Sequence, residues 1–342
     1  MATTSPLLAS LDWDTLTRIL EPGLGAALGE SVEIIDVRRL PFDGSSSFAV
    51  GRIEAVMRTG TTHAAFVKDL DPTHQLEEAK AVRDGGLERS RREVHVYRDV
   101  LPGLGLGTPA LYGLLWDDDA GYVLLLEDAG PKRLSRLGDF ELWSSAAGWL
   151  GRFHAAGRVP FPAWQLPAIT IHDLASQGRR VHRVLHRLQP DVRRAAEQGL
   201  KRLDGLLDRL YQAGGGLVHG EFFGKNVVVR PAPATEPIAV IDWETAAIAP
   251  QYLDLVSISA GRWTPQQRQA MRRAYFDARS ELDPTLPSWK AFNAEVDVAA
   301  VVNALAWLGR WSDGDDAHVE RWGREVRYTV GPLLAGEQAG AG

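Results

Sequence analysis

Short stretches of alternating apolar and polar residues, rich in Val, Ile and Phe, fill the first third of the chain between segments rich in Gly, Ser and Asp. This pattern is typical of β-strands that bury one face. The expected strands cover residues 32–40, 48–57, 63–70, 108–115 and 121–126. Amphipathic stretches at residues 12–20 and 88–100 are expected to form helices. This part of the chain therefore predicts a five-stranded antiparallel sheet with accompanying helices.

After Gly130 the apolar positions recur every three or four residues, which is the spacing of helices with one buried face. Ala146, Trp149 and Phe153 illustrate this spacing. The expected helices cover residues 140–156, 172–190, 191–213, 264–281, 287–311 and 316–334. The rest of the chain is thus predicted to be mainly helical.

Residues 217–244 interrupt the helical pattern with a predicted hairpin. Three glycines at 214–216 end the preceding helix, and the β-branched run at 227–229 begins a strand. A ProAlaProAla segment turns the chain, and residues 238–241 form the returning strand.

Polar residues gather at the open end of this hairpin. His219, Glu221 and Asn226 lie before or at the first strand, and Asp242 and Glu244 follow the second. Because the two ends of an antiparallel hairpin are neighbours, these side chains are expected to converge. Carboxylate and amide oxygens are the ligands that a hard divalent cation prefers, so the hairpin predicts a metal site.

The motif HGExxxxN followed by IDWE resembles that of the aminoglycoside phosphotransferase and choline kinase family. The usual pattern of that family is HGDxxxxN followed by IDxE or IDxG. The sequence departs from it at Glu221, where the family normally has Asp. The resemblance implies an α+β, two-lobed, protein-kinase-like fold. Residues 1–126 would form the antiparallel five-stranded nucleotide-binding lobe, residues 127–130 a hinge, and residues 131–342 the mainly helical lobe.

The resemblance also implies catalytic roles for individual residues. Lys68 would neutralise the α- and β-phosphates of a nucleotide, and Glu93 on the next helix would orient Lys68. Asn226 and Asp242 would hold Mg²⁺, and Glu221 would accept the proton of the acceptor hydroxyl or orient it. From its own sequence context alone, without the resemblance, Lys68 is interpreted as an ordinary solvated lysine at a strand end.

Further residues are implied in nucleotide binding and in support of the site. His219, Asp254 and Glu244 would be structural, although Glu244 could also act near a second metal. Backbone at the hinge would hold the base. The hinge candidates are Glu127, Asp128 and Ala129, and the candidates for the phosphate-covering loop are Gly44, Ser45, Ser46 and Ser47. A plain linker and a plain turn would have the same composition.

Composition limits the remaining possibilities. The chain has 342 residues and a formal net charge of −6. The negative net charge argues against a protein whose main function is binding nucleic acid. It has no Cys, and this excludes disulfides, zinc-thiolate sites and cysteine nucleophiles. The longest apolar stretch, near residues 298–308, is interrupted by Asn303. We expect a cytoplasmic protein without nucleic-acid or membrane partners, and the oligomeric state stays open.

The predicted function is transfer of the γ-phosphate of ATP or GTP, with Mg²⁺, to a hydroxyl of a small-molecule acceptor. Acidic turns at 116–119 and 312–316 suggest an amine-bearing acceptor such as an amino sugar or antibiotic, but ordinary surface turns look the same. The arginines of residues 172–190 fit either a solvated face or an anionic contact near the substrate. Because of Glu221, a nucleotide-binding pseudokinase with a regulatory or scaffolding role is the alternative.

Overall fold

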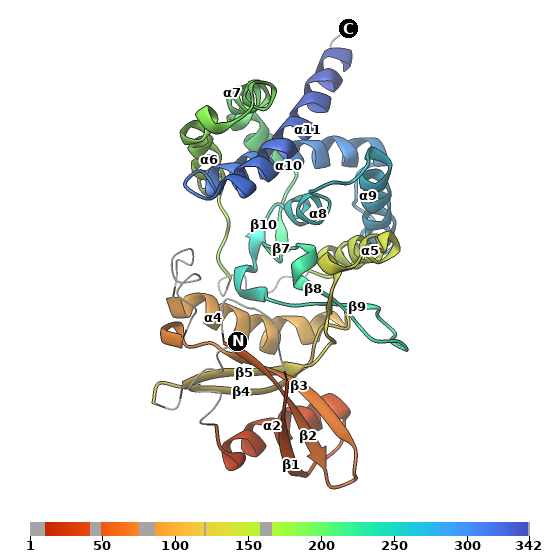
Figure 1. Ribbon diagram of the computed structural model, residues 1–342. Helices are drawn as coiled ribbons and strands as arrows, with labels where there is room; N and C mark the ends of the chain where they lie inside the picture. Colours follow the sequence, from red (N-terminus) through yellow and green to blue (C-terminus); the bar gives the residue numbers. More distant parts are fainter. Residues whose placement is uncertain (1–10, 42–48, 75–85, 120, 158–165, 341–342) are drawn as a thin grey trace. The chain divides into compact units, whose positions relative to one another are not determined.

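The computed structural model describes residues 11–41, 49–74, 86–119, 121–157 and 166–340 (Figure 1). The chain divides into two compact units. The first comprises Met1–Lys132 and Val228–Thr245, and the second comprises Arg133–Val227 and Ala246–Gly342. Residues 228–245 thus group with the sheet, whereas the resemblance implied that they belong to the helical lobe of residues 131–342.

The first unit is built on the predicted five-stranded antiparallel sheet, which has the strand order β1-β2-β3-β5-β4. Each strand lies within a few residues of its expected position. The strands are β1 (Ile34–Leu40), β2 (Val50–Met57), β3 (Thr62–Asp69), β4 (Leu111–Asp117) and β5 (Gly121–Glu127).

Helix α2 (Trp13–Leu28) covers one face of this sheet and is longer than the expected residues 12–20. The side chain of Asp12 caps its first turn, and Leu20 and Leu24 pack into a core with sheet residues such as Val67. Pro22 lies inside the helix without ending it. The helix ends where Gly29 adopts a left-handed conformation with φ of 72°.

Helix α4 (Gly86–His95) lies on the opposite face of the sheet (Figure 1). The expected regular helix over residues 88–100 is wrong at its end, because Val96–Val100 form a π-helical turn and Leu101–Leu104 a 3₁₀ turn. Pro102 cannot donate a backbone hydrogen bond, which is consistent with the helix changing its pattern there.

The hairpin consists of β8 (Val227–Val229) and β9 (Ile238–Val240), in a small sheet of order β6-β8-β9 with β6 (Lys132–Arg133). Within the first unit, Val228 and Ala239 pack against Ala129. This apolar contact fixes the hairpin next to the end of β5.

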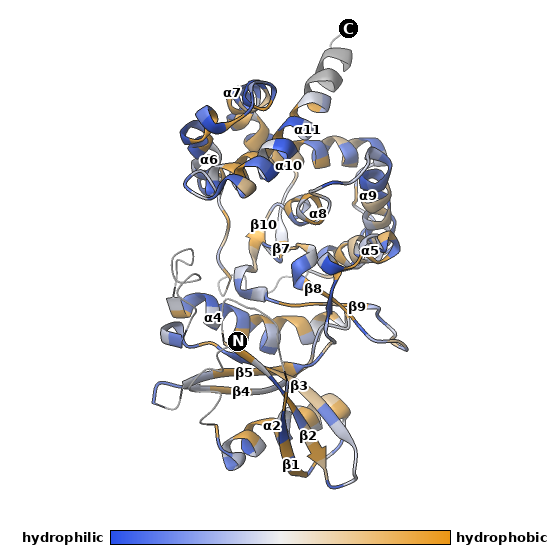
Figure 2. Ribbon diagram, viewed as in Figure 1, coloured by the Kyte–Doolittle hydropathy of each residue, from blue (hydrophilic) through white to orange (hydrophobic). Residues whose placement is uncertain are grey.

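The second unit is mainly helical, as predicted. Its helices are α5 (Phe140–Ala156), α6 (Ile171–Arg179), α7 (Pro190–Gln212), α8 (Tyr252–Ile258), α9 (Pro265–Ser280), α10 (Trp289–Arg310) and α11 (Asp316–Gly340). Strands β7 (Gly216–Val218) and β10 (Ala247–Ala249) form a short antiparallel pair. Hydrophobic and hydrophilic residues are interspersed along helices such as α7 (Figure 2), as expected for helices with one buried face.

The expected helix over residues 172–190 is wrong in its second half. Helix α6 ends at Arg179, and Arg180–Arg183 and Leu185–Arg187 form separate 3₁₀ turns. Val181 and Val184 are buried in the core in this arrangement.

Among the described residues, one helix, α10, is long and apolar enough to cross a membrane by length and composition alone. However, 67% of its most apolar window is buried inside the protein, which is typical of a core helix. A cytoplasmic location stays a prediction.

Candidate active site

Lys68 lies on β3 beside Val67, and the two side chains point to opposite faces of the sheet because strand residues alternate. Val67 packs in the core with α2, so Lys68 faces α4. There its Nζ atom donates hydrogen bonds to both carboxylate oxygens of Glu93, at 2.9 Å and 2.7 Å. The side chains of Lys68 and Glu93 are only 5% and 1% exposed. The expected facing of these two residues is therefore present in the structure.

Asp242 contributes a second carboxylate to Lys68. Its Oδ1 atom lies 2.9 Å from Nζ of Lys68, although the two residues are 174 positions apart in sequence. Asp242 has φ of 69°, the one left-handed conformation among the described residues other than glycine. This unusual backbone follows directly after the buried strand β9 and its neighbour Ile241. Backbone held in such a conformation is often found at functional sites.

The charge state of Lys68 follows from two opposing effects. Burial alone would lower the pKa of Lys68, but the carboxylates of Asp242 and Glu93 outweigh it and raise the pKa above its usual value. Lys68 is therefore an ammonium ion at neutral pH. Because the Lys68 ammonium contacts two carboxylates, it can exchange one of them for a phosphate oxygen.

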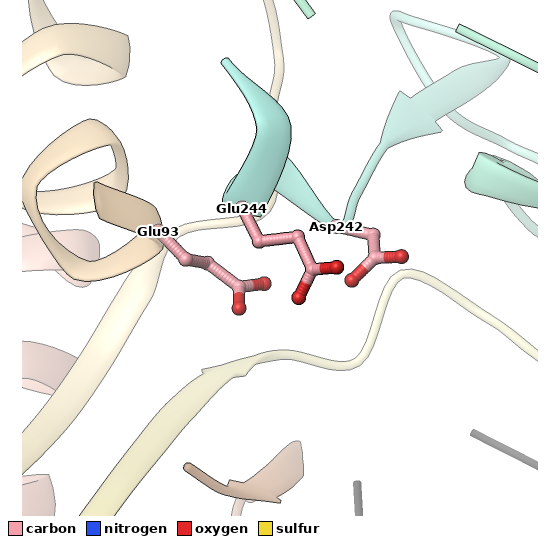
Figure 3. Close-up of side chains that lie close together, drawn as sticks. All are labelled: Glu93, Asp242 and Glu244. Atoms are coloured by element: carbon pink, nitrogen blue, oxygen red, sulfur yellow. The ribbon is translucent and has the colours of Figure 1, made fainter. Parts of the chain in front are cut away.

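Glu244 completes a cluster of three carboxylates in the first unit. Oxygen atoms of Glu93, Asp242 and Glu244 lie within 4.8 Å of one another (Figure 3). Arg89 of α4 lies 3.8 Å from Glu244. Such a set of hard oxygen donors fits Mg²⁺. Asn226 belongs to the second unit, so its expected partnership with Asp242 stays a prediction.

The three hinge candidates differ in what their backbones do. The N–H of Glu127 donates to Ala110 and that of Asp128 donates to Ala64, so neither donor is open to a base. Their side chains pair with Arg230 and Arg52 respectively. In the part of the chain that the structure describes, no hydrogen bond occupies the backbone of Ala129. Gly44, Ser45, Ser46 and Ser47 lie outside the described residues.

In the second unit, Asp254 organises the loop that follows β7. Its Oδ2 atom accepts from the N–H of His219 at 2.6 Å, and its Oδ1 atom accepts from the N–H of Gly220 at 3.0 Å. Asp254 is 1% exposed and lies in α8. Nδ1 of His219 in turn accepts from the N–H of Glu221 at 3.3 Å. A buried carboxylate thus fixes the backbone that leads to Glu221.

His154 stands behind Asp254. It is fully buried at the end of α5, with Nε2 at 3.4 Å from Oδ2 of Asp254 and Nδ1 at 2.9 Å from the hydroxyl of Tyr275. Burial lowers the pKa of His154, and Arg279 lowers it further, whereas Asp254 opposes the shift. His154 is a buried core residue, and it also supports Asp254.

Glu221 itself contacts two cations. Its Oε2 atom lies 3.1 Å from Nζ of Lys225, and its Oε1 atom lies 3.7 Å from a terminal nitrogen of Arg310. The side-chain amide of Asn226 donates to the backbone oxygen of Glu221 at 3.0 Å. Lys225 is 59% exposed. Glu221 and Asn226 are therefore held together within one loop.

Aromatic residues anchor the same loop. Phe222 is fully buried and stacks on Trp149 of α5 at a centroid distance of 5.9 Å. Trp143 lies so close to Gly224 that a Cβ atom there would overlap its ring. The loop consequently requires glycine at position 224.

Several residues of the site were not identified from sequence. Arg310 and Arg89 reach their partners from other elements, and no local pattern marks them among the many arginines of the chain. His154 offered a signal, since an isolated polar residue at a predicted buried position needs a partner.

Comparison with known proteins agrees with this geometry. Residues 48–292 match the phosphotransferase enzyme family. Choline kinase from Cryptosporidium parvum has 12% identity and a TM-score of 0.57, with 89% of this chain and 90% of that chain covered. A microcompartment-associated aminopropanol kinase has 11% identity and a TM-score of 0.57, with 92% and 97% covered. The GDP complex of aminoglycoside 2'-phosphotransferase-IIIa has 13% identity and a TM-score of 0.55, with 92% and 97% covered.

No curated protein sequence matches this chain. The structural likeness confirms the predicted kinase-like α+β fold. The family match covers well over half of the chain, so the protein belongs to the phosphotransferase enzyme family and has the fold of small-molecule kinases.

Proposed function

We propose that the protein transfers the γ-phosphate of ATP or GTP to a hydroxyl of a small molecule. The observation that carries this proposal is the contact of Lys68 with both Glu93 and Asp242, at 2.9 Å or less. A buried lysine suits the phosphates of a nucleotide, and the acids beside it suit the cation that accompanies those phosphates. A GDP complex of a structurally similar protein supports nucleotide use.

Each residue has a geometric role in this proposal. Lys68 binds the α- and β-phosphates, and Glu93 orients Lys68. Asp242 and Asn226 would hold Mg²⁺, and Glu244 lies near enough to Asp242 to assist. Magnesium would neutralise charge on the β- and γ-phosphates. Ala129 offers backbone hydrogen-bonding groups to the base.

Glu221 acts on the hydroxyl group of the acceptor in this proposal. Its carboxylate accepts the proton of the acceptor hydroxyl as that oxygen bonds to the γ-phosphorus. The bond from the γ-phosphorus to the β–γ bridging oxygen breaks, and the nucleoside diphosphate leaves with the bonding electrons. One added methylene, relative to Asp, moves the carboxylate by about 1.5 Å. A matching backbone position, fixed by Asp254, would compensate for this difference.

The test combines turnover and binding. ATP and GTP consumption is measured with a panel of amino sugars, amino alcohols, neutral sugars and hydroxy acids, and nucleotide binding by the rise in Tm with Mg²⁺ present. We expect one class of acceptor to stimulate turnover. Asp242→Ala should abolish turnover and weaken Mg-nucleotide binding, whereas Glu221→Gln should lower kcat on the order of a hundredfold and keep nucleotide binding.

Two other outcomes are informative. Nucleotide binding without turnover on any acceptor would favour the pseudokinase alternative. If neither nucleotide raises Tm, the phosphotransferase proposal and the pseudokinase alternative are both wrong.

A further inference from the structure

Charges around Glu221 indicate the kind of acceptor that this site takes. Lys225 lies 3.1 Å and Arg310 lies 3.7 Å from the two carboxylate oxygens of Glu221. Two positive charges therefore flank one negative charge. Such a surrounding attracts anions more strongly than cations.

Arg310 is not committed to Glu221. The separation of 3.7 Å is longer than a hydrogen bond, and the Arg310 side chain is 37% exposed. In the described part of the chain, its guanidinium makes no hydrogen bond to another residue. It lies over the ring of Trp307 at 4.9 Å. The guanidinium thus has open donors next to the proposed catalytic carboxylate.

The aromatic support of Arg310 is itself rigid. Trp307 stacks on Trp322 of α11, with ring centroids 5.4 Å apart and an angle of 10°. Phe223, two residues after Glu221, meets Trp307 edge-on at 5.2 Å. Arg310 is therefore positioned relative to the catalytic loop by packed rings and not only by charge.

Of the two acidic turns that could attract a cationic acceptor, the one at residues 312–316 is already paired with basic side chains. Asp313 lies 3.4 Å from Arg183, and Asp316 lies 2.6 Å from Arg187. Asp315 pairs with His318 at 2.9 Å. The arginines after α6 thus balance this turn, which leaves Arg310 as an open charge close to Glu221.

We propose that the acceptor carries an anionic group, a carboxylate or a phosphate ester, that Arg310 binds while Glu221 receives the hydroxyl. This inference rests on the proposed function and deepens it. The planar guanidinium matches both anions with two parallel hydrogen bonds. Because Arg310 and Glu221 are 3.7 Å apart, the anion and the reacting hydroxyl lie only a few bonds apart in the acceptor. The substrate class is a small hydroxy acid, a sugar acid or a sugar phosphate.

The test uses acceptors that differ mainly in charge. One series is glucuronate, glucose 6-phosphate, glucose and glucosamine, and a second is glycerate, glycerol 3-phosphate, glycerol and 3-aminopropane-1,2-diol. Phosphorylated product is measured with Mg-ATP and Mg-GTP. We expect the highest kcat/KM for an anionic member, and the comparison of carboxylate with phosphate identifies the preferred anion.

Variants assign the preference to one side chain. Arg310→Ala should lower kcat/KM for the anionic acceptor by roughly tenfold to a hundredfold, chiefly through KM, and leave the Tm rise with Mg-nucleotide intact. Arg310→Lys should recover part of the loss. Arg321→Ala is the matched control, since Arg321 also lies over a tryptophan, Trp322, at 5.3 Å. It should leave kcat/KM unchanged.

Three results would overturn this inference: a cationic or neutral member with the highest kcat/KM, no phosphorylation of any anionic member, or an anion preference that survives Arg310→Ala. Nucleotide binding separates this failure from failure of the proposed function. If Mg-nucleotide raises Tm and a cationic or neutral acceptor is phosphorylated, only the acceptor class is wrong.

Discussion

The carboxylate of Asp254 accepts a hydrogen bond from the backbone N–H of His219 at 2.6 Å, and its second oxygen accepts from Gly220 at 3.0 Å. Both donors lose a partner in Asp254→Ala. Because an unsatisfied buried donor costs about 1–3 kcal/mol, we expect the free energy of unfolding to fall by about 2–5 kcal/mol. We also expect kcat to fall, since the backbone before Glu221 is no longer fixed. Urea unfolding and steady-state kinetics measure the two effects.

Asp254→Asn is the comparison for this prediction. It keeps one acceptor oxygen and presents an amide donor to the other N–H, so its loss of stability should lie between wild type and Asp254→Ala. An alanine variant as stable as wild type would contradict the assigned role.

Because His154 is buried, we expect the free energy of unfolding to depend on pH. Burial lowers its pKa below the usual 6.5, so the folded protein favours the neutral imidazole. The stability contributed by neutral His154 is fully present above pH 6.5 and is lost as pH falls through the lower folded-state pKa. We expect the free energy of unfolding to decrease from pH 7.5 to pH 5 less steeply in His154→Gln than in wild type. Equal slopes in urea titrations would show that His154 does not cause the effect.

Because Asp242 has a left-handed backbone, two substitutions there should affect activity alike but stability differently. Asp242→Gly and Asp242→Ala both remove the carboxylate, so both should lose phosphoryl transfer. Only glycine adopts φ of 69° without steric cost, and the alanine variant should be about 1 kcal/mol less stable than the glycine variant. Chemical denaturation of the two variants checks this difference. Equal stability would mean that the backbone relaxes at this position.

Two helical glycines in the second unit should respond to alanine in opposite directions. A Cβ atom at Gly309 of α10 would overlap the backbone oxygen of Gln177, so Gly309→Ala should destabilise the protein by about 1–3 kcal/mol. Gly205 of α7 has nothing within 4 Å of its Cβ position, so Gly205→Ala should stabilise it by about 0.5–1 kcal/mol. Thermal and urea unfolding provide the measurement. A neutral Gly309→Ala variant would indicate that α6 and α10 can move apart.

Local patterns were sufficient for much of the fold. Alternating residues predicted the strand that carries Lys68, which the structure places at Thr62–Asp69, and helical spacing gave the bounds of α5 without error. The resemblance to family motifs implied roles for Asp242 and Asp254. These features depend on residues close in sequence or on turns that local chemistry determines.

Other features depend on partners far away in the chain. Residues 180–187 have helical spacing, yet they form two separate 3₁₀ turns, Arg180–Arg183 and Leu185–Arg187. Arg310 meets Glu221 across 89 positions, and no local pattern distinguishes it from other arginines. The positive φ of Asp242 was equally hidden, since a non-glycine residue with positive φ is uncommon and most aspartates adopt negative φ.

The division of the chain has a consequence for biosynthesis. Residues 228–245 complete the first unit, although 95 residues of the second unit, 133–227, are translated before them. Lys68 therefore leaves the ribosome 174 residues ahead of Asp242. Until the hairpin emerges, the nascent chain carries Lys68 without its partner Asp242. The first unit consists of two separate stretches of the chain, Met1–Lys132 and Val228–Thr245. A fragment that ends at Lys132 therefore lacks Asp242, one of the proposed phosphate-site residues.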